Sequence, residues 1–83
     1  ARRENMDFSV MIKEIRQECY LSQQSFADEL GVSFSTVNRW EKSKAVPNYQ
    51  TMKRIVSYCK SLNVDCKNLE EVWRETKNGT DTY

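Results

Sequence analysis

The sequence predicts an all-α domain made of five helices. Apolar residues recur at intervals of three and four along most of the chain, which is the period of an amphipathic helix. Residues that cap helices well stand before these segments, and Gly31 and Pro47 fall where one helix has to end or another has to begin. Because 83 residues can form one modest core, we expect a single domain over residues 7–76, with flexible segments at 1–6 and 77–83.

The first predicted helix covers residues 7–20, with Asp7 or Ser9 as its N-cap. Its apolar side chains fall on one face. They are Phe8, Met11, Ile12, Ile15 and Cys19.

Residues 22–41 predict two short helices joined by one tight turn. Ser22 caps the first helix, and Gly31 ends it because glycine readily takes the positive φ needed there. Ser33 caps the second helix, in which Val37 and Trp40 share a face with Val32. The face away from Val37 and Trp40 is short, mostly polar and once basic, which suits the floor of a DNA major groove.

The last two helices are predicted at residues 49–62 and from residue 68 onward. Asn48 is the expected N-cap of the fourth helix, after a polar and basic loop at 42–48, and Asn68 is the expected N-cap of a short fifth helix. The free backbone N–H groups at Tyr49 and Gln50 suit a phosphate oxygen. Trp73 either closes the core or forms half of a two-fold interface, and its size favours the core.

Positive charge is concentrated in residues 33–60, which start at the second of the two short predicted helices. Residues 33–60 hold six basic residues and one acidic residue, a net charge of +5, whereas the net charge of the whole chain is only +1. Phosphate attraction requires such a local excess. Charged residues are also common on solvated helix faces, so the asymmetry alone does not establish nucleic-acid binding.

The run LSQQSFADELGVSFSTVNRWE resembles the helix-turn-helix of the Cro and phage-repressor type, the Xre family. The resemblance implies a λ-repressor-like fold in which helices 2 and 3 form the helix-turn-helix. It also implies sequence-specific binding of double-stranded DNA, a role as a transcriptional repressor, and a homodimer on a palindromic site. The residues expected to face the bases are Ser33, Phe34, Ser35, Thr36, Asn38 and Arg39. Those expected to hold the DNA backbone are Gln23, Lys42, Lys44, Asn48 and Tyr49.

Three further expectations come with this resemblance. Arg16 stands where several relatives place an arginine that pairs with an acid at the end of helix 3, here Glu41. Tyr20 and Ser43 stand where many relatives carry glycine, so either the turns differ or these residues take a positive φ. Phe34 replaces a polar residue, and it either packs on a thymine methyl group or folds back onto the domain.

Catalysis, metal binding and membrane insertion are not expected. The chain lacks histidine, and its three cysteines, Cys19, Cys59 and Cys66, are widely spaced and odd in number. We therefore expect reduced, structural thiols, no cofactor and no enzymatic activity. No apolar run approaches the roughly 20 residues that span a bilayer, so a cytoplasmic location is expected. The alternative function is a protein-interaction module, such as an antitoxin, or the DNA-binding domain of a larger protein such as a DNA methyltransferase.

Overall fold

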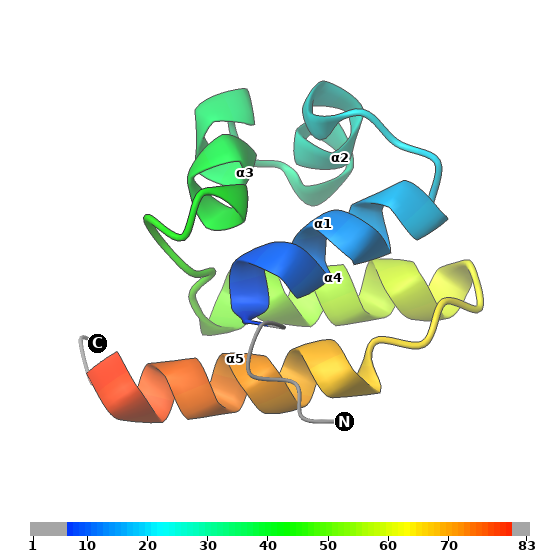
Figure 1. The fold of residues 1–83 in the computed structure, drawn as a ribbon. Helices are drawn as coiled ribbons and strands as arrows, with labels where there is room; N and C mark the ends of the chain where they lie inside the picture. Colours follow the sequence, from blue (N-terminus) through cyan, green and yellow to red (C-terminus); the bar gives the residue numbers. More distant parts are fainter. Residues whose placement is uncertain (1–6, 81–83) are drawn as a thin grey trace.

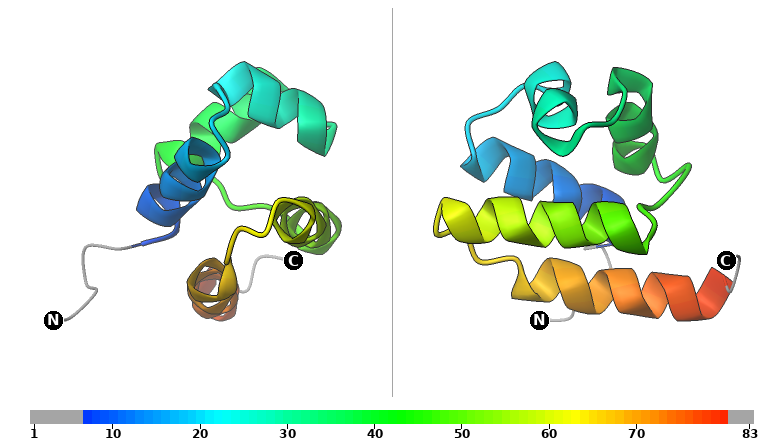
Figure 2. Two further views of the ribbon diagram at one scale, coloured as in Figure 1. Left: turned by 90° about the vertical axis from the view of Figure 1, so that its right-hand side faces the viewer. Right: turned by 180° about the vertical axis from the view of Figure 1, so that it is seen from behind.

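The computed structural model describes the backbone of residues 7–80 and the side chains of residues 7–76. The elements are α1 (Phe8–Glu18), α2 (Gln23–Leu30), α3 (Phe34–Glu41), α4 (Tyr49–Ser61) and α5 (Lys67–Thr80). Helices α2 and α3 lie on one side of the molecule and α5 lies on the opposite side, with α1 and α4 between them (Figure 1). The views in Figure 2 show the same layering, with α4 and α5 side by side. The predicted all-α, five-helix architecture is confirmed.

The first four helices begin at residues that the sequence predicts as N-caps. In each case a short polar side chain accepts a hydrogen bond from a backbone N–H of the first turn, which would otherwise have no partner. Of the two candidates for α1, Asp7 is the cap, and the Ser9 hydroxyl donates to its carboxylate. The caps are Asp7, Ser22, Ser33 and Asn48.

Helices α1 to α4 all end through a residue in the left-handed conformation. The N–H of the following residue donates back to the carbonyl five positions earlier, the bond that defines a Schellman motif. Only one of these residues is glycine, and Tyr20 and Ser43 take a positive φ, which is the second of the two alternatives stated for them. The residues are Tyr20 (φ 60°), Gly31 (φ 71°), Ser43 (φ 62°) and Asn63 (φ 60°), and the bonds are Leu21 to Arg16, Val32 to Ala27, Lys44 to Arg39 and Val64 to Cys59.

The predicted apolar faces meet in one core. Phe26, Leu30, Trp40 and Ile55 are among its fully buried side chains. Trp73 also belongs to it, because its side chain is only 6% exposed and its Nε1 donates to the carbonyl of Pro47 at 2.8 Å. Trp73 therefore closes the core of a single chain, as the sequence favoured.

Cys59 and Cys66 are buried in this core, whereas Cys19 is only partly buried. The Cys59 thiol contacts those of Cys19 and Cys66, and no disulfide joins them. Burial, the largest cause, raises the pKa of Cys59 to about 12. Burial likewise raises the pKa of Cys19 and Cys66, and the Cys66 thiol donates to a Glu70 carboxylate oxygen at 3.6 Å. These are the properties of inert structural thiols.

Helix α5 differs from the prediction at both ends. It begins at Lys67, whose N–H donates to Asp65 Oδ1, so Asn68 lies inside the first turn and is not the N-cap. The backbone stays helical to Thr80, past the expected start of a loose tail at residue 77, because no proline follows Trp73 to break the helix. The expected arm at 1–6 and residues 81–83 lie outside the described residues. Within residues 7–80, no helix is both long and apolar enough to cross a membrane.

Candidate nucleic-acid interface

Helix α3 has two opposite faces. Val37 and Trp40 are buried against the core. The six residues expected to read bases lie on the rest of the helix or at its N-cap. Ser33, Phe34, Ser35 and Arg39 are exposed, while Thr36 and Asn38 are partly buried. The helix also lies in the outer layer, away from α5 (Figure 1). One side of α3 is thus available to a ligand while the other anchors it.

Hydroxyl groups cover the N-terminus of α3. Ser33 Oγ accepts the Thr36 N–H at 3.1 Å and lies 2.8 Å from Thr36 Oγ1 and 3.1 Å from Ser35 Oγ. This end of the helix carries the positive end of the helix dipole. The cluster therefore combines small hydrogen-bonding groups with a weakly positive potential, which suits base edges and phosphate oxygens.

Phe34 remains on the surface. Its side chain is 44% exposed, so the ring is not buried in the core, and the two alternatives stated for it stay predictions. An aromatic ring at the first position of α3 leaves apolar surface in water. A partner that offers a methyl group could cover it.

Arg39 and the loop after α3 form a basic rim. Arg39 is exposed, and its Nη2 lies 3.5 Å from the carbonyl of Lys44, at the outer limit for a hydrogen bond. Lys42 and Lys44 are also exposed. The connection then reaches the N-terminus of α4, where Asn48 caps the helix and the Tyr49 ring meets Trp73 edge-on, with ring centroids 5.0 Å apart. Four of the expected backbone-binding residues therefore lie on one continuous segment, 42–49.

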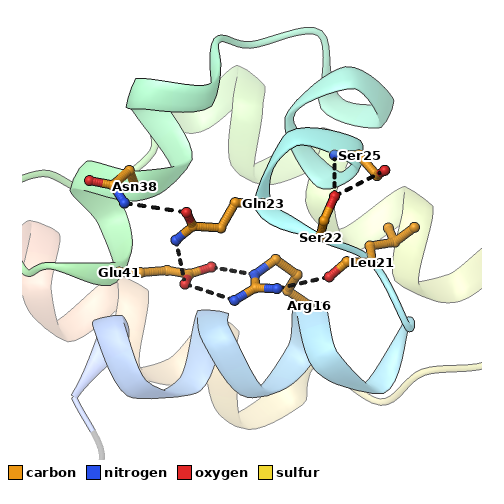
Figure 3. Close-up of polar contacts among 7 residues, drawn as sticks. All are labelled: Arg16, Leu21, Ser22, Gln23, Ser25, Asn38 and Glu41. Carbon is orange, nitrogen blue, oxygen red and sulfur yellow. Dashed lines mark hydrogen bonds and ion pairs between the residues drawn. The ribbon is translucent and has the colours of Figure 1, made fainter.

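Gln23, the fifth, is placed differently from the other four. Its Nε2 donates to Glu41 Oε1 at 2.9 Å, and its Oε1 accepts from Asn38 Nδ2 at 3.3 Å (Figure 3). Both ends of the amide thus have partners within the protein. No local pattern predicts these contacts, because they join Gln23 of α2 to residues of α3 that are 15 and 18 positions away in the chain.

The expected ion pair of Arg16 and Glu41 is present. Arg16 Nε donates to Glu41 Oε2 at 2.7 Å and Nη2 donates to Oε1 at 3.1 Å. A third donor, Nη1, reaches the carbonyl of Leu21 at 2.8 Å (Figure 3). The side chains are only 12% and 5% exposed. A bidentate and largely buried pair of this kind holds the end of α3 against α1.

Pairing also removes the one negative charge from the basic segment. All six basic residues of 33–60 are exposed, whereas Glu41 is turned inward onto Arg16. The outward field of this segment is therefore more positive than its net charge of +5 indicates. The six are Arg39, Lys42, Lys44, Lys53, Arg54 and Lys60.

Sequence reasoning missed the role of Arg54. Its Nη1 donates to the carbonyl of Leu30 at 3.3 Å, and it lies beside Gly31, 3.5 Å from where a Cβ would stand. It thus ties α4 to the end of α2 and adds a cation next to the turn between α2 and α3. Nothing in the local pattern distinguishes it from an ordinary solvated arginine.

Comparison with known proteins agrees with this geometry. The protein family described as "Helix-turn-helix" matches residues 12–64 of the chain. The HTH-type transcriptional activator BcrR of Enterococcus faecalis is 30% identical over 60 residues, which cover 72% of this chain and 29% of that protein. The chain thus spans less than a third of the length of this relative. No solved structure matches the chain significantly. The match over most of the domain, together with the fold, shows that the chain belongs to the Xre/Cro-type helix-turn-helix family of DNA-binding domains.

Proposed function

We propose that this domain binds double-stranded DNA sequence-specifically, with α3 in the major groove, and that it serves in transcription regulation. The observation that carries the proposal is the division of α3 into a buried apolar face and an exposed polar face, with the exposed cations Arg39, Lys42 and Lys44 on that helix or directly after it. We infer a binding role and no reaction, because the chain has no histidine and burial raises the pKa of all three of its thiols.

The residues of α3 are assigned by their chemistry. Ser33, Ser35, Thr36, Asn38 and Arg39 face base edges. Phe34 packs on a thymine methyl group. Lys42, Lys44 and the backbone N–H groups at the start of α4 hold phosphates on the flanking DNA backbone.

The regulatory role is supported by the enterococcal relative, which is named a transcriptional activator. The resemblance to phage repressors implies the opposite sign, and repression is the role that we propose for this chain. A reporter gene behind the selected binding site, measured with and without the protein, gives the sign directly. An increase in expression would establish activation.

We also propose that the domain binds a palindrome as a homodimer. One such domain reads few base pairs, and two copies related by two-fold symmetry reach major grooves about 34–36 Å apart, one helical turn of DNA. Sedimentation of the complex should then give two chains per palindromic duplex. One chain per duplex at saturation contradicts this stoichiometry.

The central test is a binding selection from random duplexes at two salt concentrations. We expect one enriched motif and an affinity that falls steeply with salt, because several cations displace condensed counterions. Equal binding to all duplexes would refute sequence-specific recognition. Capture of a protein partner, without any enriched DNA sequence, would favour the protein-interaction alternative.

Arg39→Ala tests the reading helix itself. The change should weaken binding to the selected site about 5- to 150-fold, the range for loss of one bidentate contact to guanine, and should leave the melting temperature nearly unchanged. Arg74→Ala is the matched control, because Arg74 is also exposed but lies on α5. Equal losses on the selected site and on random DNA would assign Arg39 to a phosphate.

A further inference from the structure

The hydrogen bonds between α1 and α3 run in one direction only. Glu41 is a carboxylate and can only accept, so every group that touches it must donate. Arg16 supplies two of these donors. The third contact comes from Gln23, which must therefore turn its Nε2 toward Glu41, as it does at 2.9 Å. The orientation of the Gln23 amide is fixed by the chemistry of its partner.

The orientation of the Gln23 amide in turn determines the orientation of the Asn38 amide. With Nε2 on Glu41, the other end of the Gln23 amide is a carbonyl oxygen, which can only accept. Asn38 therefore donates to it from Nδ2, at 3.3 Å. A flipped Asn38 would set two carbonyl oxygens against each other. Figure 3 shows the result, with Nδ2 turned toward Gln23 and Oδ1 turned away from it.

Asn38 is left with one acceptor and one donor for an outside partner. These are Oδ1 and the second hydrogen of Nδ2, which lie side by side on one edge of the amide. In the major groove, adenine presents the complementary pair, the N6 amino donor beside the N7 acceptor. Guanine presents two acceptors, thymine one acceptor and a methyl group, and cytosine one donor. Adenine alone satisfies both groups.

We propose that Gln23 is a positioning residue, oriented by the Arg16–Glu41 pair, which sets Asn38 to read adenine. The proposal rests on the proposed DNA-binding function and specifies the base at one position of the site. It also replaces the expected phosphate contact of Gln23 with an indirect role in specificity.

The test is a complete base-substitution series of the selected site, measured with four proteins: wild type, Asn38→Ala, Gln23→Ala and Gln24→Ala. Gln24 is the control because it is the exposed neighbour of Gln23, and its amide bonds within α2 to Asp28. At one position, wild type should prefer adenine about 5- to 150-fold. Asn38→Ala should abolish that preference and leave the others intact. Gln23→Ala should reduce it, chiefly against guanine, since a freed Asn38 amide can rotate. Gln24→Ala should leave it unchanged.

Each contrary result has a distinct meaning. Wild type without any base preference refutes the proposed function as well. A wild type with preferences that Asn38→Ala leaves untouched refutes only the adenine assignment. A uniform loss for all sequences in Gln23→Ala, with the adenine preference intact, returns Gln23 to the phosphate backbone. If Gln23→Ala does not fold, Asn38→Asp decides: it offers acceptors only, so the preferred base should change from adenine to cytosine, and retained adenine preference overturns the proposal.

Discussion

The two sides of this molecule are held together by different forces. Helices α4 and α5 are 13 and 14 residues long and bury apolar side chains such as Ile55, Leu69 and Trp73. Helices α2 and α3 have only 8 residues each, and their packing is supplemented by the largely buried Arg16–Glu41 pair. Apolar burial stabilises without regard to direction, whereas a bidentate ion pair fixes the orientation of the two helices that it joins, here α1 and α3. Directional bonds thus occur where the helix proposed to enter a groove has to be aimed.

The largest expected effect comes from breaking the Arg16–Glu41 ion pair. Glu41→Ala removes one partner of the pair and leaves the Arg16 charge poorly compensated, so the free energy of unfolding should fall by about 3–5 kcal/mol. Denaturant titration measures this loss. Arg74→Ala is the control, because its pair with Glu70 is a 3.8 Å contact with side chains 59% and 34% exposed, and should change stability by less than about 0.5 kcal/mol.

A double replacement sharpens the result. Arg16→Met with Glu41→Leu removes both charges, so stability should return to near the wild-type value. Affinity for the selected DNA should remain low, because α3 has lost the bonds that orient it. Full recovery of both stability and DNA affinity would mean that apolar packing alone aims the helix.

Trp73→Phe tests the side formed by α4 and α5 at the buried hydrogen bond between Trp73 and Pro47. The change keeps an aromatic ring but removes the donor to the carbonyl of Pro47, a fully buried residue. An unsatisfied buried carbonyl should lower the free energy of unfolding by about 1–3 kcal/mol. DNA affinity, measured at a temperature where the variant is folded, should change little. A loss of affinity larger than the loss of stability would contradict the separation of the two sides.

Alkaline pH should lower the stability of the domain through Cys59, which lies on α4. The pKa of Cys59 is raised from 9.0 to about 12, so the unfolded chain ionises at a lower pH than the folded one. Protonated Cys59 therefore contributes its full stabilisation below about pH 9. Above that pH the free energy of unfolding should fall by up to about 1.4 kcal/mol per pH unit. Urea titrations between pH 7 and pH 10 measure the slope, and Cys59→Ala should have a shallower one. An equal slope in both proteins would exclude this thiol as the cause.

Tyr20→Gly is expected to have the smallest effect and to be stabilising. Tyr20 has φ 60° and a side chain that is 94% exposed, so glycine relieves backbone strain without removing packing. The gain should be about 1 kcal/mol, seen as a higher melting temperature. Tyr20→Ala keeps the strain and should show no gain. Stabilisation of equal size in both variants would place the cause in the ring and not in the backbone.

Much of the fold was readable because its signals are local. Ser22, Ser33 and Asn48 cap helices through hydrogen bonds to residues three positions later. Gly31 takes the left-handed conformation, which a residue without a side chain adopts without strain. The start of α5 was misplaced because Asn68 is the cap that the sequence predicts, whereas the helix begins one residue earlier, at Lys67, whose N–H donates to the Asp65 carboxylate. Its continuation past residue 76 was missed because a polar helix end carries no apolar period to follow.

The candidate site was readable in its residues but not in its connections. The division of α3 follows from helical spacing, and the Arg16–Glu41 pair follows from resemblance. The partners of Gln23 and the contact of Arg54 with Leu30 depend on where distant helices meet, and long polar side chains have many possible partners until that geometry exists.

Both tryptophans, Trp40 and Trp73, are buried in the core. Their intrinsic fluorescence therefore follows unfolding of the domain without any added label. A ligand that binds only the folded state raises the unfolding midpoint by mass action, in proportion to the logarithm of its concentration over its dissociation constant. Titrating duplexes into a fluorescence melt would thus rank candidate operators through the light emitted by the protein interior.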